Sequence, residues 1–161
     1  MNKYLKDFVK KTFAAPGTAL DLGAGDGADM QGLGAMGWTC FGVDLKTGIN
    51  LEYSYHSDHR PFDLVYSCFV LHKLVSPRTL VSTAFDNVRP NGFVFIQTFD
   101  ASDSNSQSTL TEDSLVHLLN DVGLIDVTTR LLRHYDSDPG HQHWHIILEA
   151  CGRRTEVTPV L

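Results

Sequence analysis

Residues 20–27 read Leu-Asp-Leu-Gly-Ala-Gly-Asp-Gly and place three glycines at alternate positions directly after an apolar run. Glycine has no Cβ to hold a ligand away from the backbone, and it accepts positive φ without strain. The apolar residues 18–22 predict a short strand that enters this turn, and a helix is expected from about residue 28 to residue 36. The segment therefore predicts a strand, a turn that approaches a ligand and a helix, with a purely structural turn as the alternative.

Strands and helices alternate through most of the chain. Further strands are expected at residues 39–45, 62–69, 93–99, 125–133 and 144–151, and further helices at residues 3–13, 77–88 and 111–120. Such alternation predicts an α/β fold with a parallel sheet covered on both faces. The last two strands have no helix between them and should form a hairpin, so that one strand runs antiparallel at the sheet edge.

Composition limits the class of protein. The chain has 161 residues, 42% of them hydrophobic, which suits one globular domain. It contains no run of 18 apolar residues that would span a membrane, and its lysine-rich start lacks the apolar core of a secretory signal. A net charge of -6 argues against nucleic acid as a partner. Three widely spaced cysteines fit a reducing compartment, so a cytoplasmic location is expected.

The second strand is followed by Asp44, an acid placed to bind the two hydroxyls of a ribose. Such an acid and a glycine turn fit both a dinucleotide and S-adenosylmethionine (SAM). The dinucleotide pattern is G-x-G-x-x-G, whereas the glycines here stand at every second position. The turn and its flanks also carry three acids, Asp21, Asp26 and Asp29. A pyrophosphate avoids such acids, whereas SAM carries an ammonium and a sulfonium, so SAM is the favoured ligand.

Several segments resemble motifs of the class I SAM-dependent methyltransferase family, and together they cover about residues 3–152. They are the first motif at residues 20–27, the strand-two acid in Phe41-Gly-Val-Asp44, the fourth-strand motif at residues 62–74, the turn before strand five at residues 88–96 and the final hairpin. Within this class the chain resembles small bacterial tellurite-resistance and thiopurine-type methyltransferases. The similarity lies in the short first helix and the histidine-rich segment 138–150. It implies a Rossmann-like sheet in the order 3-2-1-4-5-7-6, a domain over residues 1–152 and a C-terminal tail, residues 153–161, expected to be disordered.

The resemblance also implies a set of cofactor-binding residues for SAM and its product S-adenosylhomocysteine. The glycine turn would hold the methionine part of SAM, with Asp21 near the ammonium, while Asp44 would bind the ribose and Leu45 would flank the adenine. The end of the strand at residues 62–69 would line the path to the methyl group. The full set is Asp21, Gly23, Ala24, Gly25, Gly27, Asp44, Leu45, Asn50, Leu51, Ser67, Cys68 and Phe69.

The segment after Asp44 departs from this family. Residues 45–62 alone separate Asp44 from Asp63, where the family places a helix and a whole strand. We expect the helix to be deleted and the third strand to shrink to residues 48–51. Asn50 would then stand where an acid usually meets the adenine amine, with Asp58 as the rival candidate. An adenine pocket left open would predict weak SAM binding or closure by a partner chain, as in a homodimer.

Methyl transfer needs alignment of donor and acceptor more than covalent help, and a base only where the acceptor carries a proton of high pKa. His72, after the strand at residues 62–69, is the one general-base candidate, although a helix-face histidine that contacts solvent or the methionine end of SAM is favoured. Tyr4, Phe8 and Tyr66 are candidates for the acceptor pocket, although core packing is favoured for Phe8 and Tyr66.

Three histidines alternate near the C-terminus, His141, His143 and His145, so on a strand they share one face. Neighbours on that face lie about 6.5 to 7 Å apart, too far for three ligands on one metal ion. A solvated strand face or the rim of the acceptor site is favoured, and no metal is expected. The polar loop at residues 100–109 is either an acceptor cover or a plain linker.

The function predicted from these features is SAM-dependent methyl transfer to a small-molecule acceptor, by in-line displacement at the methyl carbon. The alternative is a degenerate methyltransferase-fold module or partner subunit that binds SAM without turnover. The sequence does not distinguish nitrogen, oxygen, sulfur or a metalloid as the acceptor atom.

Overall fold

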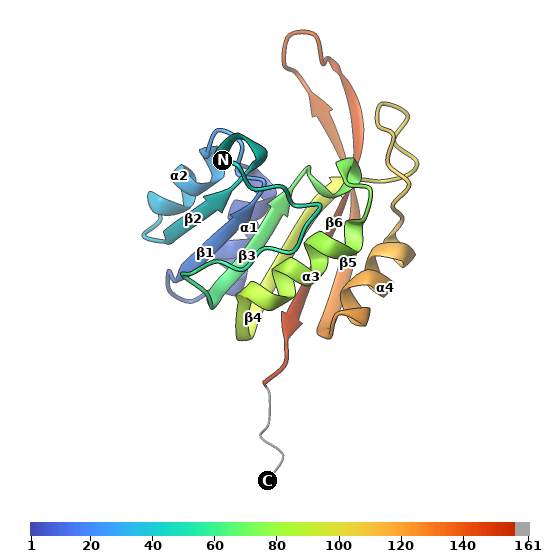
Figure 1. Ribbon diagram of the computed structural model, residues 1–161. Helices are drawn as coiled ribbons and strands as arrows, with labels where there is room; N and C mark the ends of the chain where they lie inside the picture. Colours follow the sequence, from blue (N-terminus) through green and yellow to red (C-terminus); the bar gives the residue numbers. More distant parts are fainter. Residues whose placement is uncertain (157–161) are drawn as a thin grey trace.

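Six strands form one sheet in the order β2-β1-β3-β4-β6-β5 in the computed structural model, which describes residues 1–156 (Figure 1). The strands are β1 (Thr18–Leu22), β2 (Thr39–Val43), β3 (Phe62–Cys68), β4 (Val88–Phe99), β5 (Leu124–Asp136) and β6 (His143–Arg154). The helices are α1 (Lys3–Thr12), α2 (Ala28–Gly34), α3 (Pro77–Asn87) and α4 (Glu112–Asp121), with 3-10 turns η1 (Leu45–Thr47) and η2 (Leu71–Lys73). The mixed α/β fold predicted from the alternating pattern is confirmed.

The seven-strand order predicted above is only partly right, because the third strand is missing. Residues 48–51 form no strand, and β2 is the edge of the sheet on this side. The short segment after η1 is held by side chains instead of a ladder. Glu52 accepts the backbone N–H of Val75 at 2.8 Å, and the Asn87 amide accepts from the backbone of Ser57 at 2.9 Å. These contacts tie the segment to the region of α3. Residues 48–51 turn instead of extending along β2, since the Ile49 N–H donates to the Asp44 carbonyl at 3.0 Å and the Tyr53 N–H donates to the Asn50 carbonyl at 3.1 Å.

The final hairpin has the predicted reversal, with β6 antiparallel to both of its neighbours. The reversed strand lies inside the sheet, between β4 and β5, so the strand at the edge is β5. β6 continues through Arg153 and Arg154, past the predicted domain end at residue 152, because both residues pair with neighbouring strands. Residues 157–161 of the predicted tail lie outside the described residues.

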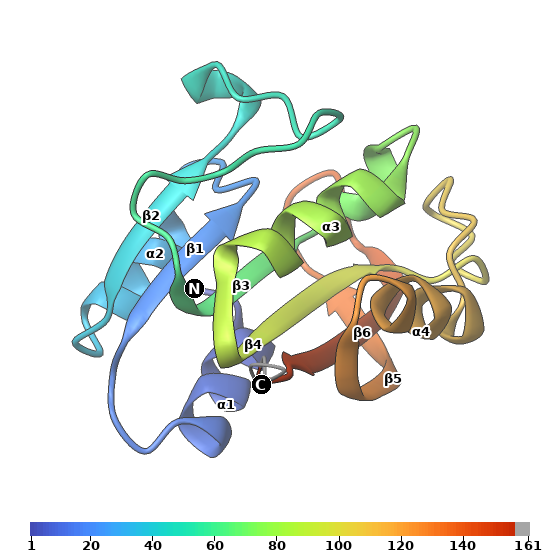
Figure 2. The ribbon, with the colours of Figure 1, turned by 60° about the horizontal axis from the view of Figure 1, so that its bottom comes forward.

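Helices cover both faces of the sheet, α3 and α4 on one and α1 and α2 on the other (Figure 2). The central strand β3 is buried on both sides, as its nearly continuous apolar sequence predicts. Leu64 and Tyr66 pack toward the α1 side, whereas Val65 packs toward the α3 side. Among the described residues, no helix has the length and apolar character needed to cross a membrane.

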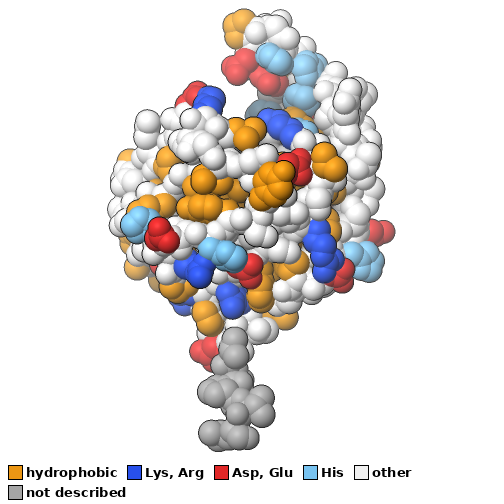
Figure 3. Space-filling view, in the orientation of Figure 1, with side chains coloured by type: hydrophobic (Ala, Val, Ile, Leu, Met, Phe, Trp, Pro, Cys, Tyr) orange, Lys and Arg blue, Asp and Glu red, His pale blue; other side chains and the backbone are white. Residues whose placement is uncertain are grey.

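The parallel strands β1, β2, β3 and β4 end at the same edge of the sheet, where ligands bind in open α/β folds. The glycine turn follows β1 there, and Asp44 follows β2. The tip of the β5–β6 hairpin rises beyond this edge (Figure 1). Acidic and histidine side chains gather on that tip (Figure 3). The fold therefore brings the turn, the acid and the histidine-rich hairpin to one end of the molecule.

Candidate functional site

The glycine turn has the backbone that its sequence predicts. Gly23, Gly25 and Gly27 have φ values of 99°, 52° and 76°, in the left-handed region that favours glycine. A Cβ on Gly23 would lie 2.2 Å from Cγ2 of Val70, so no side chain fits there. A Cβ on Gly25 would meet nothing within 4 Å. The turn is therefore packed on one side and leaves open space above its middle glycine.

Asp44 links this turn to the segment that follows β2. One carboxylate oxygen accepts the backbone N–H of Lys46 at 2.9 Å, and the other accepts that of Gly25 at 3.1 Å. The Lys46 hydrogen bond, helped by that of Gly25, lowers the pKa of Asp44 below its ordinary value. The Lys46 ammonium also lies 2.9 Å from Asp26. An ionised carboxylate therefore faces the crevice next to the open backbone of the turn.

A cavity of about 600 Å³, termed the β2-side cavity, lies between the glycine turn and the segment after Asp44. It is lined by Gly23, Gly25, Asp44, Leu45, Lys46, Ile49, Asn50, Leu51, Glu52, Cys68, Phe69, Val70, Lys73 and Leu74. The residues predicted around an adenine, Leu45, Asn50 and Leu51, all line it, whereas Asp58 is exposed and lies outside it. The Asn50 side-chain oxygen accepts the N–H of Glu52 at 3.0 Å.

A second cavity of about 650 Å³, termed the β6-side cavity, adjoins the first. It is lined by Met1, Asn2, Lys3, Tyr4, Ala24, Asp26, Ala28, Asp29, Cys68, Phe69, Phe99, His134, Asp136, His145 and Ile147. Cys68 and Phe69 line both cavities. Phe69 has a φ of 62°, which is strained for a bulky residue, and its N–H donates to the carbonyl of Gln97 at 2.8 Å. A strained residue at the end of β3 thus forms the common wall.

Three of the predicted cofactor residues lie behind the walls of these cavities. Asp21 is buried, and burial raises its pKa to about 7, with the carboxylates of Asp29 and Asp44 adding to the effect. Ser67 is buried and donates its hydroxyl to the carbonyl of Leu22 at 2.7 Å. Gly27 is the N-cap residue of α2. These three residues therefore line neither cavity and lie beneath the glycine turn or at the start of α2.

The predicted general base, His72, lines neither cavity. Its Nδ1 lies 3.1 Å from the Thr98 hydroxyl, and its ring packs against Phe99. Burial lowers the pKa of His72 to about 4. Of the aromatic acceptor candidates, Tyr4 lines the β6-side cavity, whereas Tyr66 is buried in the core and Phe8 packs against that core.

Asn2 is a site residue that the sequence reasoning missed. Its side-chain oxygen caps α1 by accepting the N–H groups of Tyr4 and Leu5, and its own N–H donates to Asp29 at 2.6 Å. Its amide nitrogen donates to Gln97 at 2.6 Å. An Asn directly before an amphipathic helix is a cap signal, so the first of these contacts was readable from sequence. The contacts with α2 and β4 join segments far apart in the chain and carry no local signal.

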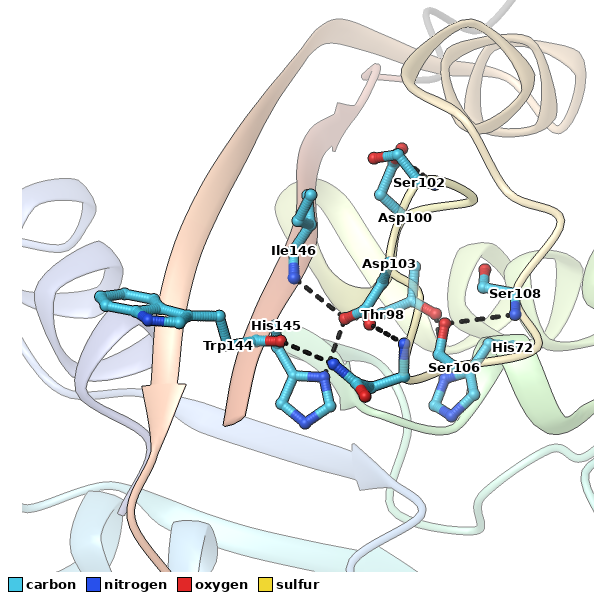
Figure 4. Close-up of polar contacts among 11 residues, drawn as sticks. His72, Thr98, Asp100, Ser102, Asp103, Ser106, Ser108, Trp144, His145 and Ile146 are labelled. Carbon is cyan, nitrogen blue, oxygen red and sulfur yellow. Dashed lines mark hydrogen bonds and ion pairs between the residues drawn. The ribbon is translucent and has the colours of Figure 1, made fainter. Parts of the chain in front are cut away.

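His145 and Asp103 form a second pairing that was missed. His145 Nδ1 lies 2.8 Å from Asp103 Oδ2, and both side chains are nearly buried (Figure 4). Asp103 belongs to the polar loop after β4, and this loop also contacts the hairpin through Asn105, whose amide donates to the Trp144 carbonyl at 3.0 Å. The loop therefore packs against the hairpin and supplies an acid to one cavity-lining histidine.

Of the other two histidines in the alternating run, His143 is on β6 with His145, whereas His141 precedes the strand, so the predicted shared face holds for His143 and His145 alone within residues 141–145. The ring centroids of His143 and His145 lie 4.5 Å apart, and those of His141 and His143 lie 6.2 Å apart. Within residues 1–156 no group of three His, Cys, Asp or Glu side chains has the arrangement needed to hold a metal ion.

Comparison with known proteins gives a consistent result. A family model described as a methyltransferase domain matches residues 1–149. A curated relative, the ubiquinone biosynthesis O-methyltransferase of Shewanella sp. (strain ANA-3), is 26% identical over 101 residues, with 50% of this chain and 43% of that protein covered. The match thus spans less than half the length of this relative.

Solved structures with the same fold include several methyltransferases. The 1,6-didemethyltoxoflavin-N1-methyltransferase of Burkholderia thailandensis, with 1,6-didemethyltoxoflavin and S-adenosylhomocysteine bound, has a TM-score of 0.73 at 20% identity, covering 96% of this chain and 78% of that one. TehB from Haemophilus influenzae has a TM-score of 0.70 at 15% identity, covering 96% of this chain and 63% of that one.

Proposed function

Because this chain belongs to the class I SAM-dependent methyltransferase family, we propose that it transfers the methyl group of SAM to a small-molecule acceptor. The observation that carries this proposal is the junction of the two cavities at Cys68 and Phe69. A donor held on the β2 side and an acceptor held on the β6 side would meet at that junction. Each cavity has the volume of an ordinary small-molecule site, roughly 300–1,000 Å³. Separate but adjoining spaces favour the alignment that methyl transfer requires.

The β2-side cavity fits the adenosine part of SAM. Each Asp44 oxygen accepts one backbone N–H and retains a lone pair for a ribose hydroxyl. Leu45 and Leu51 supply apolar walls for the adenine ring. The Asn50 oxygen is engaged with a backbone N–H, and its NH₂ group, which makes no hydrogen bond within residues 1–156, is left to meet the ring nitrogens. Asn50 would then serve where an acid is more usual.

The glycine turn fits the methionine part. The open space over Gly25 is a cradle that a side chain would fill. Asp29 and Asp26 line the neighbouring space and provide negative charge for a cationic ligand. When bound, SAM supplies a methyl group on a sulfonium, which a nucleophile can attack directly. The chain's own task is therefore to orient the donor, exclude water and present the acceptor at Cys68 and Phe69.

The second candidate function is a module that binds SAM without turnover. It is favoured by the missing third strand, since the short segment after Asp44 leaves Leu45 71% exposed at the mouth of the cavity. It is disfavoured by the β6-side cavity, which a binding module would not need.

Calorimetric titration with SAM and with S-adenosylhomocysteine tests the cofactor half of the proposal. We expect micromolar binding of both ligands to the unmodified chain and no measurable binding to Asp44→Ala. Asp86→Ala is the matched control, because Asp86 is half-exposed and its contact is with His56. Unchanged binding by Asp44→Ala, or no binding by the unmodified chain, would contradict the proposal. Binding without methylation of any acceptor would support the second candidate.

A further inference from the structure

The β6-side cavity has walls made of aromatic rings. The centroids of Phe69 and Phe99 lie 5.1 Å apart, and the Phe99 ring stacks on His145 at 4.5 Å. A second pair, Tyr4 and His134, packs edge to face at 6.2 Å on the same cavity. Flat rings prefer offset or edge-to-face contacts with such side chains. The cavity therefore suits a planar aromatic ligand, which can stack on these side chains.

His145 is the one histidine of this wall whose ring is fixed by a buried acid. Asp103 Oδ2 accepts from His145 Nδ1 at 2.8 Å and from the Ile146 N–H at 2.9 Å, while Oδ1 accepts the Asn105 N–H at 2.7 Å (Figure 4). Burial opposes ionisation of this carboxyl, but the three hydrogen bonds outweigh it and hold the pKa of Asp103 below its ordinary value. Asp103 is therefore an anion aimed at one ring nitrogen.

This contact decides which nitrogen of His145 can react. An ionised carboxylate only accepts hydrogen bonds, so Nδ1 carries the proton in the neutral ring. Nε2 is then the basic nitrogen, and it makes no hydrogen bond within residues 1–156. Because His145 lines the β6-side cavity, Nε2 is the nitrogen left for a ligand there. A histidine oriented by a buried acid is the usual arrangement of a general base.

We propose that His145, oriented by Asp103, is the general base of this protein and that its acceptor is an aromatic hydroxyl. The inference rests on the methyl transfer proposed above. As the acceptor oxygen attacks the methyl carbon, the O–C bond forms and the C–S bond breaks, with its electron pair left on sulfur. His145 Nε2 takes the hydroxyl proton, and Asp103 stabilises the resulting imidazolium.

The chemistry of the acceptor group separates the alternatives. A phenolic hydroxyl has a pKa of about 10 and stays protonated near neutral pH, so its attack gains from a base. A thiol, with a pKa of about 8.5, is already partly ionised. A neutral aromatic amine presents a lone pair without losing a proton first. A fixed base in an aromatic cavity therefore fits a hydroxyl best.

The surroundings of His145 also limit the acceptor's charge. Asp26, Asp29 and Asp136 line the same cavity with one lysine, Lys3, so the acids outnumber the lysine and disfavour a carboxylated phenol. The ionisable groups that face the imidazole or its immediate neighbours are Asp103 from the loop, His143 and His134 from the hairpin, and His72 beyond Phe99. A pH profile must therefore be compared between variants before it is assigned to His145.

The first test is methylation of catechol with SAM by the whole chain, followed by mass spectrometry, beside aniline and thiophenol as matched acceptors. We expect O-methylated product, with His145→Gln slowing turnover by about 10²- to 10⁴-fold, the usual contribution of a general base. S-adenosylhomocysteine affinity should stay unchanged in this variant. His141→Gln is the control, since His141 is exposed at the hairpin tip and lines neither cavity.

The second test needs no turnover. 4-Nitrophenol, whose visible absorption reports ionisation, is added to the chain saturated with S-adenosylhomocysteine. We expect bound 4-nitrophenol to ionise at lower pH than the free compound, and the shift to vanish in His145→Gln and to shrink in Asp103→Asn.

Wild-type rate and pH profile in His145→Gln would overturn the role of the base. Methylation of aniline or thiophenol alone would overturn the acceptor class. Binding of S-adenosylhomocysteine with methylation of none of the three acceptors would overturn the inference and support the second candidate function instead. Failure to bind S-adenosylhomocysteine at all would instead remove the proposed function on which the inference rests. In a His145 variant that loses S-adenosylhomocysteine binding, the rate does not report on the base, and Asp103→Asn then decides the question through the pH profile.

Discussion

The two cavities that meet at Cys68 and Phe69 are built in different ways. The β2-side cavity is made of three segments, the glycine turn, residues 44–52 and residues 68–74, and residues 44–52 supply half of its lining residues. The β6-side cavity draws on the N-terminal residues, Ala24 and Asp26 of the glycine turn, the start of α2, the ends of β3 and β4, and both strands of the hairpin. One short run of sequence therefore supplies half of the first cavity, whereas the second is assembled from segments spread between Met1 and Ile147.

On the β2 side, the largest effect is expected at Asp21, the buried acid before the glycine turn, and it concerns the pH dependence of the free energy of unfolding. Its carboxyl ionises near pH 3.8 when unfolded but holds its proton to about pH 7 in the fold, because it is buried. The folded state therefore binds more protons in this window, and the free energy of unfolding falls as the pH rises through it, by on the order of 4 kcal/mol. Asp21→Asn should lose most of this dependence in urea unfolding between pH 4 and pH 8.

The exposed Asp121→Asn, which affects only a surface pair with Arg78, is the control and should keep the wild-type slope. Parallel curves for Asp21→Asn and the unmodified chain would show that Asp21 titrates normally.

The glycine turn should give the next largest effect. Gly23→Ala adds a Cβ 2.2 Å from Val70 at a φ of 99°, so the turn must shift. We expect S-adenosylhomocysteine binding to weaken by about 100-fold, equivalent to about 2.7 kcal/mol. Gly34→Ala, where a Cβ meets nothing within 4 Å, should bind normally and be slightly more stable, since it lies on a helix. Equal binding by both variants would remove the packing argument for Gly23.

A substitution at the β6-side cavity should change the rate of turnover and leave the affinity for the cofactor unchanged. Asp103→Asn keeps the size of the side chain but removes the charge that orients His145, and its NH₂ group cannot accept the hydrogen bonds of the oxygen that it replaces, so turnover should fall by about 10- to 100-fold. Calorimetry should find S-adenosylhomocysteine binding unchanged. A parallel loss of turnover and of S-adenosylhomocysteine binding would show that the β6-side cavity contributes to cofactor binding, which contradicts separate roles for the two cavities.

The smallest effect on cofactor affinity is expected at Glu52, whose carboxylate holds the segment after Asp44 against Val75. Glu52→Ala removes the carboxylate that accepts the N–H of Val75, freeing one wall of the β2-side cavity. S-adenosylhomocysteine affinity should fall by about 5-fold, close to 1 kcal/mol. Asp58→Ala, on the same segment but outside the cavity, should bind as the unmodified chain does. A larger loss at Asp58 would restore it as the adenine-contacting acid.

The same contrast explains what the sequence could predict. Each observed helix and strand falls near its predicted position, because apolar periodicity and turn residues are local signals. The missing third strand could only be suspected from the short spacing after Asp44. The His145–Asp103 pair was beyond reach, because it joins positions 42 residues apart and depends on the register of β6 against β4. The prediction of His72 as the base followed strand order alone, and burial places that ring outside both cavities.

Phe69 adds a consequence for directed evolution of this protein. Its φ of 62° would cost glycine nothing but is unfavourable for phenylalanine, so Phe69→Gly should relieve backbone strain. The same change would remove the wall that separates the two cavities. Selection for thermal stability alone would therefore weigh this relief only against the lost packing of the ring on Phe99 and the added freedom of glycine in the unfolded chain, whereas selection for turnover would also maintain the wall between the cavities.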